Sequence, residues 1–199
     1  MYVKGHIPKH KGKCVTTEPI KQLEAIADIK HYLRYQPRNL ALFTLAVNSA
    51  FRSSDILNLR HENLKWLRNN CYEINAKEKK TGKIRIVVLN ESASLVLHNY
   101  IEMCRYTRPD DLVFPGIRGP MGTSYFGRMC KRWIREGTLT DGRWSTHSLR
   151  KTWVYHQHKT FDVELSTLMY ALNHSSERQT LQYMGALSED VASAYKNAL

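Results

Sequence analysis

The sequence predicts an α+β fold that is mainly helical and contains a small antiparallel sheet. Apolar residues recur at helical spacing along most of the 199 residues. Two short runs, 72–76 and 84–88, instead alternate apolar with other residues, as strands do. No internal repeat or low-complexity tract interrupts these patterns, and the length suits one domain.

The first 16 residues form a basic segment that we interpret as a flexible arm or, equally, as a solvated tail. A first helix is expected to follow it, because Thr17 and Pro19 provide a cap and a first-turn signal. Apolar residues at helical spacing continue to Leu33, and the helix should end near Pro37.

Two more helices are predicted before the alternating runs. Asn39 can cap a helix that continues to Val47, and Ser53 with Asp55 can start the next one. Arg52 therefore lies at the junction between two predicted helices. We interpret Asp55 as a structural residue that caps its helix and helps to fix Arg52.

The alternating runs are predicted to pair as a hairpin with a basic tip, Lys77-Glu78-Lys79-Lys80-Thr81-Gly82-Lys83. The helical pattern then returns and continues to the end of the chain. The later helices are expected at 91–106, 123–136, 147–159, 162–171 and 177–183, with Val191, Ala194 and Leu199 on one possible helical face beyond them.

The charge of the chain points to a polyanionic partner. Lys and Arg number 30 against 18 Asp and Glu, which leaves a formal charge of +12. Residues 160–199 contain only two of these bases, so the basic surface belongs to the first 159 residues. Nucleic acid is the expected partner, and an acidic membrane surface is the rival one.

Cysteines and apolar runs exclude several classes of protein. Cys14, Cys71, Cys104 and Cys130 are far apart and form no C-x-x-C pair, so neither a disulfide framework nor a four-cysteine zinc site is indicated. This usage fits a reducing cytoplasm. No apolar run is long enough for a signal peptide or a membrane span.

Three metal-ligating residue types near the N-terminus recur every four positions, namely His6, His10 and Cys14. They would share one face of a helix, but glycines and a proline within this segment argue against a helix there. We therefore expect no metal site and no cofactor.

Five candidate motifs follow one another in a single order. Arg52 precedes an acidic and apolar helix start, and Lys80 lies at the hairpin tip. His147-Ser-Leu-Arg150 places an imidazole and a guanidinium on one helix face, where both can reach one phosphate. Leu172-Asn173-His174 comes next, and Tyr183 follows nine residues after the histidine. Each residue alone has an ordinary structural explanation, so the joint order carries the signal.

This order resembles that of the tyrosine recombinase, or phage integrase, family, over roughly residues 20–184. The resemblance implies a catalytic domain that cleaves and rejoins DNA without ATP or metal, in integration, excision or inversion by a mobile element. It implies a 3′-phosphotyrosine made by Tyr183 and a freed 5′-hydroxyl. Asn173 departs from the family pattern, which has glycine before this histidine.

The chemistry of phosphoryl transfer explains the residue types. Negative charge builds on two non-bridging oxygens, which the guanidinium groups of Arg52 and Arg150 match bidentately. By resemblance, His147 takes the proton of the tyrosine and His174 contacts the scissile phosphate. Lys80 is our choice for the acid that protonates the leaving 5′-oxygen. Lys79 and Lys83 compete for this role.

The resemblance leaves two other functions open. A type IB topoisomerase would relax supercoils with the same residues, and a regulator derived from a recombinase would bind DNA without cutting it. The six intact candidate residues argue against the regulator.

The domain organisation and the partners follow from the same resemblance. We expect a basic arm at 1–16, a catalytic domain at 17–199 and no separate N-terminal DNA-binding domain. The tail at 184–199 would dock on a neighbouring protomer or on its own domain. The expected partners are double-stranded DNA, three further copies in a tetramer on two sites, and an accessory DNA-binding protein.

Overall fold

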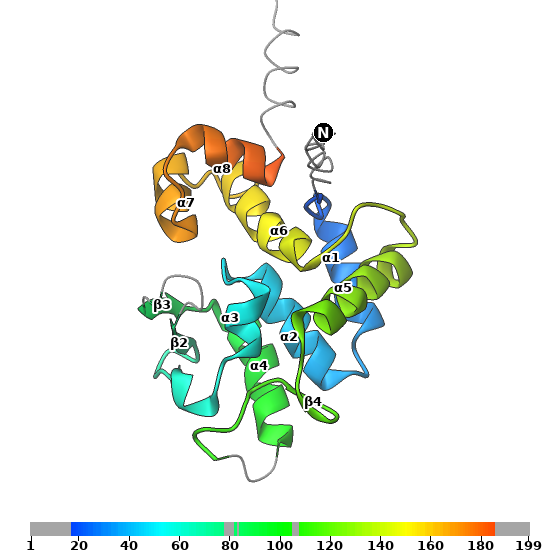
Figure 1. Cartoon of the computed structure of the whole chain (residues 1–199), viewed down its shortest axis with the longest axis vertical. Helices are drawn as coiled ribbons and strands as arrows, with labels where there is room; N and C mark the ends of the chain where they lie inside the picture. The colour runs from blue at the N-terminus through cyan, green and yellow to red at the C-terminus, as the bar shows by residue number, and fades with distance from the viewer. Residues whose placement is uncertain (1–16, 78–81, 83, 105–107, 186–199) are drawn as a thin grey trace, which may run out of the picture.

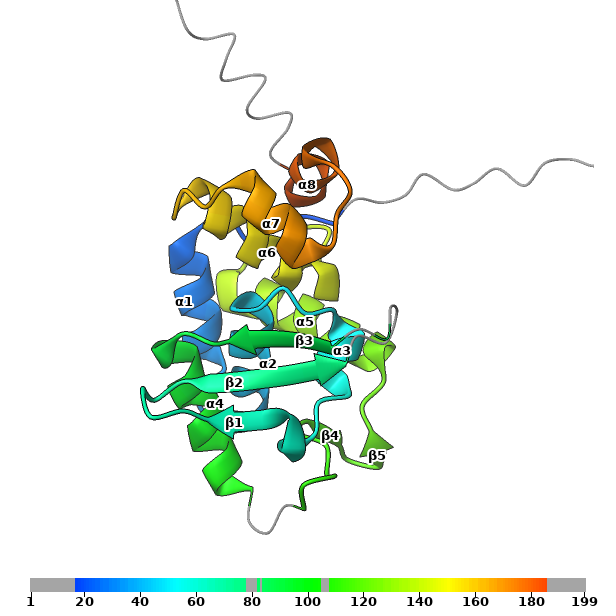
Figure 2. The same cartoon turned by 90° about the vertical axis from the view of Figure 1, so that its left-hand side faces the viewer.

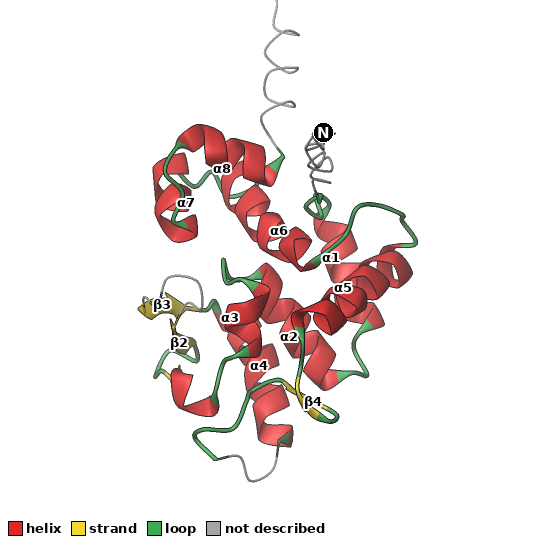
Figure 3. Cartoon of the chain, in the orientation of Figure 1, coloured by secondary structure: helices red, strands yellow, loops and turns green. Residues whose placement is uncertain are grey.

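The computed structural model describes residues 17–77, 82, 84–104 and 108–185. The basic arm, the tail beyond Gly185 and Lys80 with its two competitors lie outside these residues. Helices dominate the described part, which also contains a three-stranded sheet and a short two-stranded one (Figure 3). The mainly helical α+β class is therefore confirmed. Among the described helices, none combines the length and the apolar character needed to cross a membrane.

The described part of the chain begins with a non-helical strap, residues 17–20, and not with the predicted helix. The backbone N–H of Ile20 donates to Thr152 Oγ1 at 2.8 Å, and the Ile20 carbonyl lies 2.9 Å from His156 Nε2. Because these groups of a later helix bind its backbone, the strap continues past Thr17 and Pro19, and α1 spans Leu23–Tyr32. The predicted cap at Thr17 was wrong.

The next two helices begin close to the expected positions. Helix α2 spans Pro37–Val47 with its proline in the first turn, so the predicted cap at Asn39 was wrong and the helix starts earlier. Helix α3 spans Ser53–Leu57, and Arg52 is its N-cap residue, as predicted for the junction.

The predicted hairpin is confirmed as part of a three-stranded antiparallel sheet (Figure 2). Strand β2 spans Tyr72–Lys77 and pairs with β3, Ile84–Val88, with Ile74 opposite Val87. Sequence analysis missed β1, which spans Leu64–Trp66 and follows a single 3-10 turn at His61–Asn63. Three residues are too few to show an alternating pattern, and β1 is held by pairing with β2.

The remaining helices follow the predicted order, and the short strands β4 and β5 between two of them were not predicted. Helices α4 and α5 flank a short hairpin of β4 and β5, and α6, α7 and α8 lie together at one end of the molecule (Figure 1). Their bounds are Glu91–Met103 for α4, Pro115–Gly116 for β4, Gly119–Pro120 for β5, Thr123–Thr138 for α5, Thr146–Lys159 for α6, Leu165–Leu172 for α7 and Glu177–Met184 for α8.

Two hydrophobic clusters hold these elements. The larger cluster joins α1 to α5 and the sheet, and Leu149 of α6 belongs to it. The smaller cluster joins α6, α7 and α8, and it includes Val154 and the buried Ala50 that precedes α3. Helix α6 and the segment before α3 therefore cross the boundary between the clusters.

Candidate active site

Arg52 is fixed at the start of α3 by its neighbour one turn later. The backbone N–H of Arg52 donates to Asp55 Oδ2 at 3.2 Å, and Arg52 Nη1 lies 3.9 Å from the same oxygen. Asp55 is only 3% exposed and lies behind the arginine. The interpretation of Asp55 as a capping residue that fixes Arg52 is confirmed.

The sheet supports the segment that carries Arg52. Arg85 of β3 donates from Nη1 to the Ala50 carbonyl at 3.1 Å, and its guanidinium lies 5.3 Å from the centre of the Phe51 ring. The hairpin is thus attached to the backbone two residues before Arg52. A movement of the hairpin would be transmitted to this arginine.

Helix α6 carries the first histidine and the second arginine. Ser145 caps this helix and accepts a hydrogen bond from the His147 backbone at 3.1 Å, so the histidine lies in the first turn, near the surface. Arg150, one turn further, is only 5% exposed, and its Nη2 donates to the Leu172 carbonyl at 3.3 Å. This bond ties the guanidinium to the end of α7.

His174 follows a left-handed turn that closes α7. Asn173 adopts φ 56° and ψ 48°, the conformation for which glycine is favoured and asparagine is the usual substitute. The departure from the family glycine therefore leaves the turn intact. The backbone N–H of His174 donates to the Met169 carbonyl at 3.0 Å, and its Nδ1 lies 3.1 Å from Thr180 Oγ1 on α8.

Tyr183 lies on the last turn of α8, between these groups. Its ring meets the His174 ring edge to face, with the centres 5.3 Å apart, and the guanidinium carbon of Arg150 lies 5.9 Å from its centre. Within the part of the chain that the structure describes, its buried hydroxyl has no hydrogen-bond partner. The phenol is thus held among cationic and imidazole side chains.

Burial and positive charge set the proton equilibria of the cluster. Burial raises the pKa of Tyr183, and the cations Arg150 and Arg52 act in the opposite direction. Partial desolvation, followed by the charges of Arg150, Lys151 and Arg52, lowers the pKa of His147, although the imidazole lies near the surface. Desolvation and the two arginines also lower the pKa of His174. At neutral pH the cluster therefore holds a protonated phenol and neutral imidazoles.

Five of the six predicted site residues are brought together here: Arg52, His147, Arg150, His174 and Tyr183. The sixth, Lys80, lies outside the described residues. Within the described residues, no cluster of three metal-ligating His, Cys, Asp or Glu residues occurs. Of the N-terminal candidates His6, His10 and Cys14, none lies in the described part.

Sequence reasoning missed two further residues at this site. Thr180 is fully buried and contacts His174, and it lies one helical turn before Tyr183. Lys151 is 4% exposed, and its ammonium lies 5.2 Å from the centre of the Tyr183 ring. The spacing of Thr180 from Tyr183 was a usable signal. Nothing in the sequence separates Lys151 from the other lysines.

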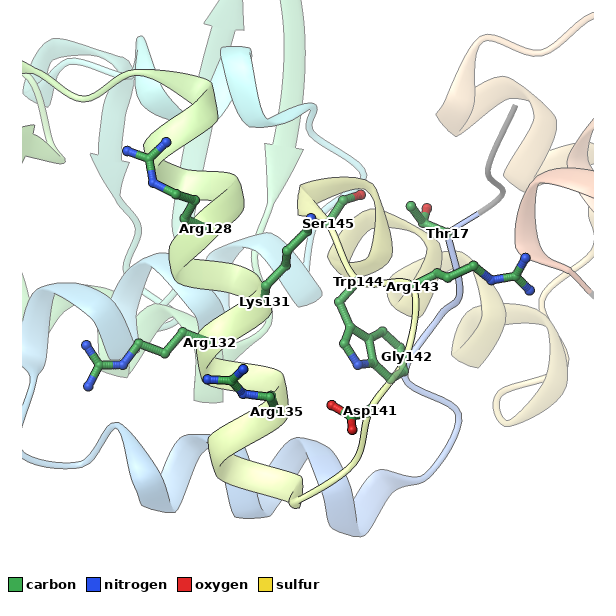
Figure 4. A pocket seen from close by; sticks show the side chains of 10 residues that line it. All are labelled: Thr17, Arg128, Lys131, Arg132, Arg135, Asp141, Gly142, Arg143, Trp144 and Ser145. Atoms are coloured by element: carbon green, nitrogen blue, oxygen red, sulfur yellow. The ribbon is translucent and has the colours of Figure 1, made fainter. Parts of the chain in front are cut away.

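Two grooves adjoin the cluster. One, of about 640 Å³, lies between α5 and residues 141–145 and contains Arg128, Lys131, Arg132, Arg135 and Arg143. In Figure 4, Lys131 reaches from α5 toward Ser145. The other, of about 900 Å³, lies between β3 and helices α6 and α7, and His174 lines it.

Comparisons with known proteins identify the family of the chain. A family model described as the phage integrase family matches residues 16–189. The chain is 31% identical over 182 residues to the probable integrase/recombinase YoeC of Bacillus subtilis (strain 168), covering 90% of this chain and 95% of that protein. It is 26% identical to the tyrosine recombinase XerC of Mesorhizobium japonicum (strain LMG 29417 / CECT 9101 / MAFF 303099), covering 96% of this chain and 61% of that protein.

Solved structures show the same fold. The crystal structure of XerA recombinase matches with a TM-score of 0.72 and 18% identity, covering 92% of this chain and 67% of that one. XerH bound to its palindromic difH substrate matches with a TM-score of 0.68 and 23% identity, covering 92% of this chain and 54% of that one. The motif order, the fold and the relatives lead to one conclusion: the chain belongs to the phage integrase family and is a site-specific tyrosine recombinase.

Proposed function

We propose that the cluster around Tyr183 is the active site of this DNA recombinase and that each of its side chains has the role expected from the sequence. The observation that carries the proposal is the convergence of four chain segments on one phenol. Arg52 comes from the start of α3, His147 and Arg150 from α6, His174 from the turn after α7, and Tyr183 from α8.

The proposed reaction exchanges one phosphodiester for another. Tyr183 Oη attacks phosphorus and gives its proton to His147, while the bond from phosphorus to the 5′-oxygen breaks. Arg52 and Arg150 stabilise the charge on the non-bridging oxygens, and His174 donates a hydrogen bond to the same phosphate. The products are a 3′-phosphotyrosine and a 5′-hydroxyl, whose proton we assign to Lys80. Reversal on a second strand rejoins the DNA.

The basic groove beside α5 supports a DNA path that leads to this site. Ser145, which caps the helix of His147, lines the groove together with Thr17. Cations on α5 would contact phosphates along the duplex on the way to the scissile one. The first 16 residues, with four lysines and no acid, would extend these contacts as the expected arm.

We extend the proposal to assembly and location. Four copies would exchange strands between two DNA sites, together with an accessory DNA-binding protein. The tail beyond Met184 would lie at a protomer boundary. The reaction would take place in the cytoplasm of a bacterial or viral host cell. The support is indirect. Similar proteins include XerH bound to difH and a lambda integrase dimer bound to a core site. The described cysteines, Cys71, Cys104 and Cys130, are free thiols.

A trapping experiment tests the active site. A library of nicked duplexes of random sequence is incubated with the protein, because cleavage beside a nick releases a short fragment and leaves the enzyme attached. Covalent complexes are recovered under denaturing conditions and their DNA is sequenced. Wild-type protein and Tyr170→Phe, whose phenol is 92% exposed, should form them. Tyr183→Phe should not, and an undiminished yield from this variant refutes the nucleophile.

Two changes of condition test the other roles. Cleavage should proceed in EDTA, because we assign charge neutralisation to Arg, Lys and His side chains. If sulfur replaces the scissile 5′-oxygen, the leaving thiol departs without a proton, so this substrate should rescue Lys80→Ala but not Arg52→Ala. Rescue of Lys79→Ala or Lys83→Ala instead would move the acid to that lysine.

A further inference from the structure

Lys151, directly after Arg150 on α6, holds a buried charge next to the nucleophile. The side chain is 4% exposed, and its Nζ donates to the carbonyl of Thr17 at 2.7 Å. The same nitrogen lies 5.2 Å from the centre of the Tyr183 ring. Burying an ammonium costs free energy unless polar groups bind it, so the bond to the Thr17 carbonyl is needed to hold the charge at this position.

The carbonyl that binds Lys151 belongs to the strap formed by residues 17–20. Further contacts hold this strap. Ile20 is bonded through its N–H to Thr152 and through its carbonyl to His156, and Glu18 Oε1 lies 2.9 Å from Arg143 Nη2. The strap thus lies along α6. Its first residue, Thr17, binds Lys151, whose ammonium lies beside the Tyr183 ring.

We propose that Lys151 is a positioning residue for Tyr183. The orientation of the Tyr183 ring then depends on the bond between Lys151 and the strap. The inference rests on the proposed function, because it takes Tyr183 as the nucleophile and His147 as its base. Lys151 is not assigned a contact with the DNA phosphate. It acts through the ring that it touches and through the charge that it holds in place.

Two physical effects follow from the position of the ammonium. An ammonium near an aromatic ring is attracted to it and restricts its orientation, and small displacements of a nucleophile cost much of its rate. The charge of Lys151 also acts on the proton acceptor, together with Arg150 and Arg52. Desolvation, and after it these cations, lower the pKa of His147 and keep the imidazole neutral.

Several charged or titratable groups face the pair formed by Tyr183 and His147. Arg52 comes from the start of α3, Arg150 and Lys151 from α6, and His174 from the turn after α7. Lys151 also binds the strap, through the Thr17 carbonyl. Its two effects, the tie to Thr17 and the charge, can therefore be separated by substitution.

The test compares three variants. Lys151→Gln keeps an N–H donor for Thr17 and loses the charge, whereas Lys151→Met loses both. Lys21→Met is the matched control, because Lys21 lies 5.8 Å from the centre of the Tyr155 ring and on the surface. The cleavage rate on the trapped DNA sequence is measured from pH 5 to 9. The titration of His147 is followed by NMR without DNA, and thermal unfolding checks that each variant is folded.

Both Lys151 variants should raise the pKa of His147 and move the acid limb of the rate profile to higher pH. Lys151→Met should also lower the rate at high pH, on the order of tenfold to a hundredfold below that of Lys151→Gln, because it loses the bond to the strap as well as the charge. Lys21→Met should change neither. An unchanged His147 titration in both Lys151 variants overturns the proposal, and so does an equal high-pH rate in the Gln and Met variants.

The NMR arm keeps the inference separate from the proposed function. If wild-type protein forms no covalent complex with any DNA, the proposed active site fails. The titration of His147 still decides whether the charge of Lys151 lowers the pKa of His147. If Lys151→Met does not fold, the Gln variant alone tests the charge.

Discussion

The two hydrophobic clusters of this molecule differ in size and in what they carry. The larger one packs α1 to α5 against the sheet, and Leu42, Phe43 and Phe114 within it are fully buried. The smaller one rests on a few buried side chains of α6 to α8, among them Leu172 and Met184. Arg52 is attached to the larger cluster, whereas the nucleophile is attached to the smaller one. We therefore expect the smaller cluster to open without unfolding of the larger one.

The boundary between the clusters explains where the site lies. Ala50 packs in the smaller cluster and Phe51 in the larger one, immediately before Arg52. Helix α6 places Leu149 in the larger cluster and Val154 in the smaller one, with Arg150 between them. The two arginines thus occupy the segments that hold the clusters together.

The largest effects should come from the two arginines, one from each side of the boundary. Arg52→Ala and Arg150→Ala should each lower the cleavage rate by about 10²- to 10³-fold, because each removes a donor to the phosphate charge. Only Arg150→Ala should also lower the protection of α7 from hydrogen exchange, because it removes the bond to the Leu172 carbonyl. If hydrogen exchange in α7 is equal in the two variants, the bond from Arg150 to the Leu172 carbonyl does not hold α6 and α7 together.

A matched pair of leucines tests the independence of the clusters. Leu42→Ala should lower the free energy of unfolding of the whole domain by about 2–5 kcal/mol, as expected for a filled core. Leu172→Ala, with a side chain almost as buried, should mainly increase hydrogen exchange in α7 and α8 and reduce cleavage. Exchange that rises equally in α2 and α8 in both variants would show one cooperative core.

The smallest effect concerns pH. Because the pKa values of His147 and His174 are lowered, the native state holds these imidazoles neutral while the unfolded chain takes up protons near its ordinary pKa of about 6.5. The stability that they contribute is present above that pH and is lost as the pH falls toward their native pKa values. The urea midpoint should therefore drop between pH 7.5 and 5, and less so when both are replaced by Gln. An equal drop in both proteins would assign the loss to other groups.

Much of the fold could be predicted from periodicity and turn residues, because these act locally. The hairpin of β2 and β3 and helices α4 to α8 were recognisable in this way. The strap at 17–20 was not, because its conformation depends on Thr152 and His156, more than 130 residues away. The start of α2 was missed for another reason. Pro37 was interpreted as the end of one helix, although proline fits the first turn of the next.

Some residues of the candidate site could likewise be predicted from the sequence, and others could not. Arg52, His147, Arg150, His174 and Tyr183 belong to motifs with a fixed order, so the sequence identified them before any contact was known. Lys151 and Thr180 act through contacts that only the folded chain creates. Lys151 carries no motif, and for Thr180 only its spacing of one helical turn from Tyr183 could have been used.

The central claim is that residues from both clusters converge on one phosphate, and a transition-state mimic tests it most directly. The protein is crystallised with vanadate and the two DNA fragments that flank its cleavage position. Our account predicts vanadium bonded to Tyr183 Oη, with its equatorial oxygens contacted by both Arg52 and Arg150 and by His174. Vanadium bonded to another tyrosine, or contacted by the arginine of only one cluster, would contradict it.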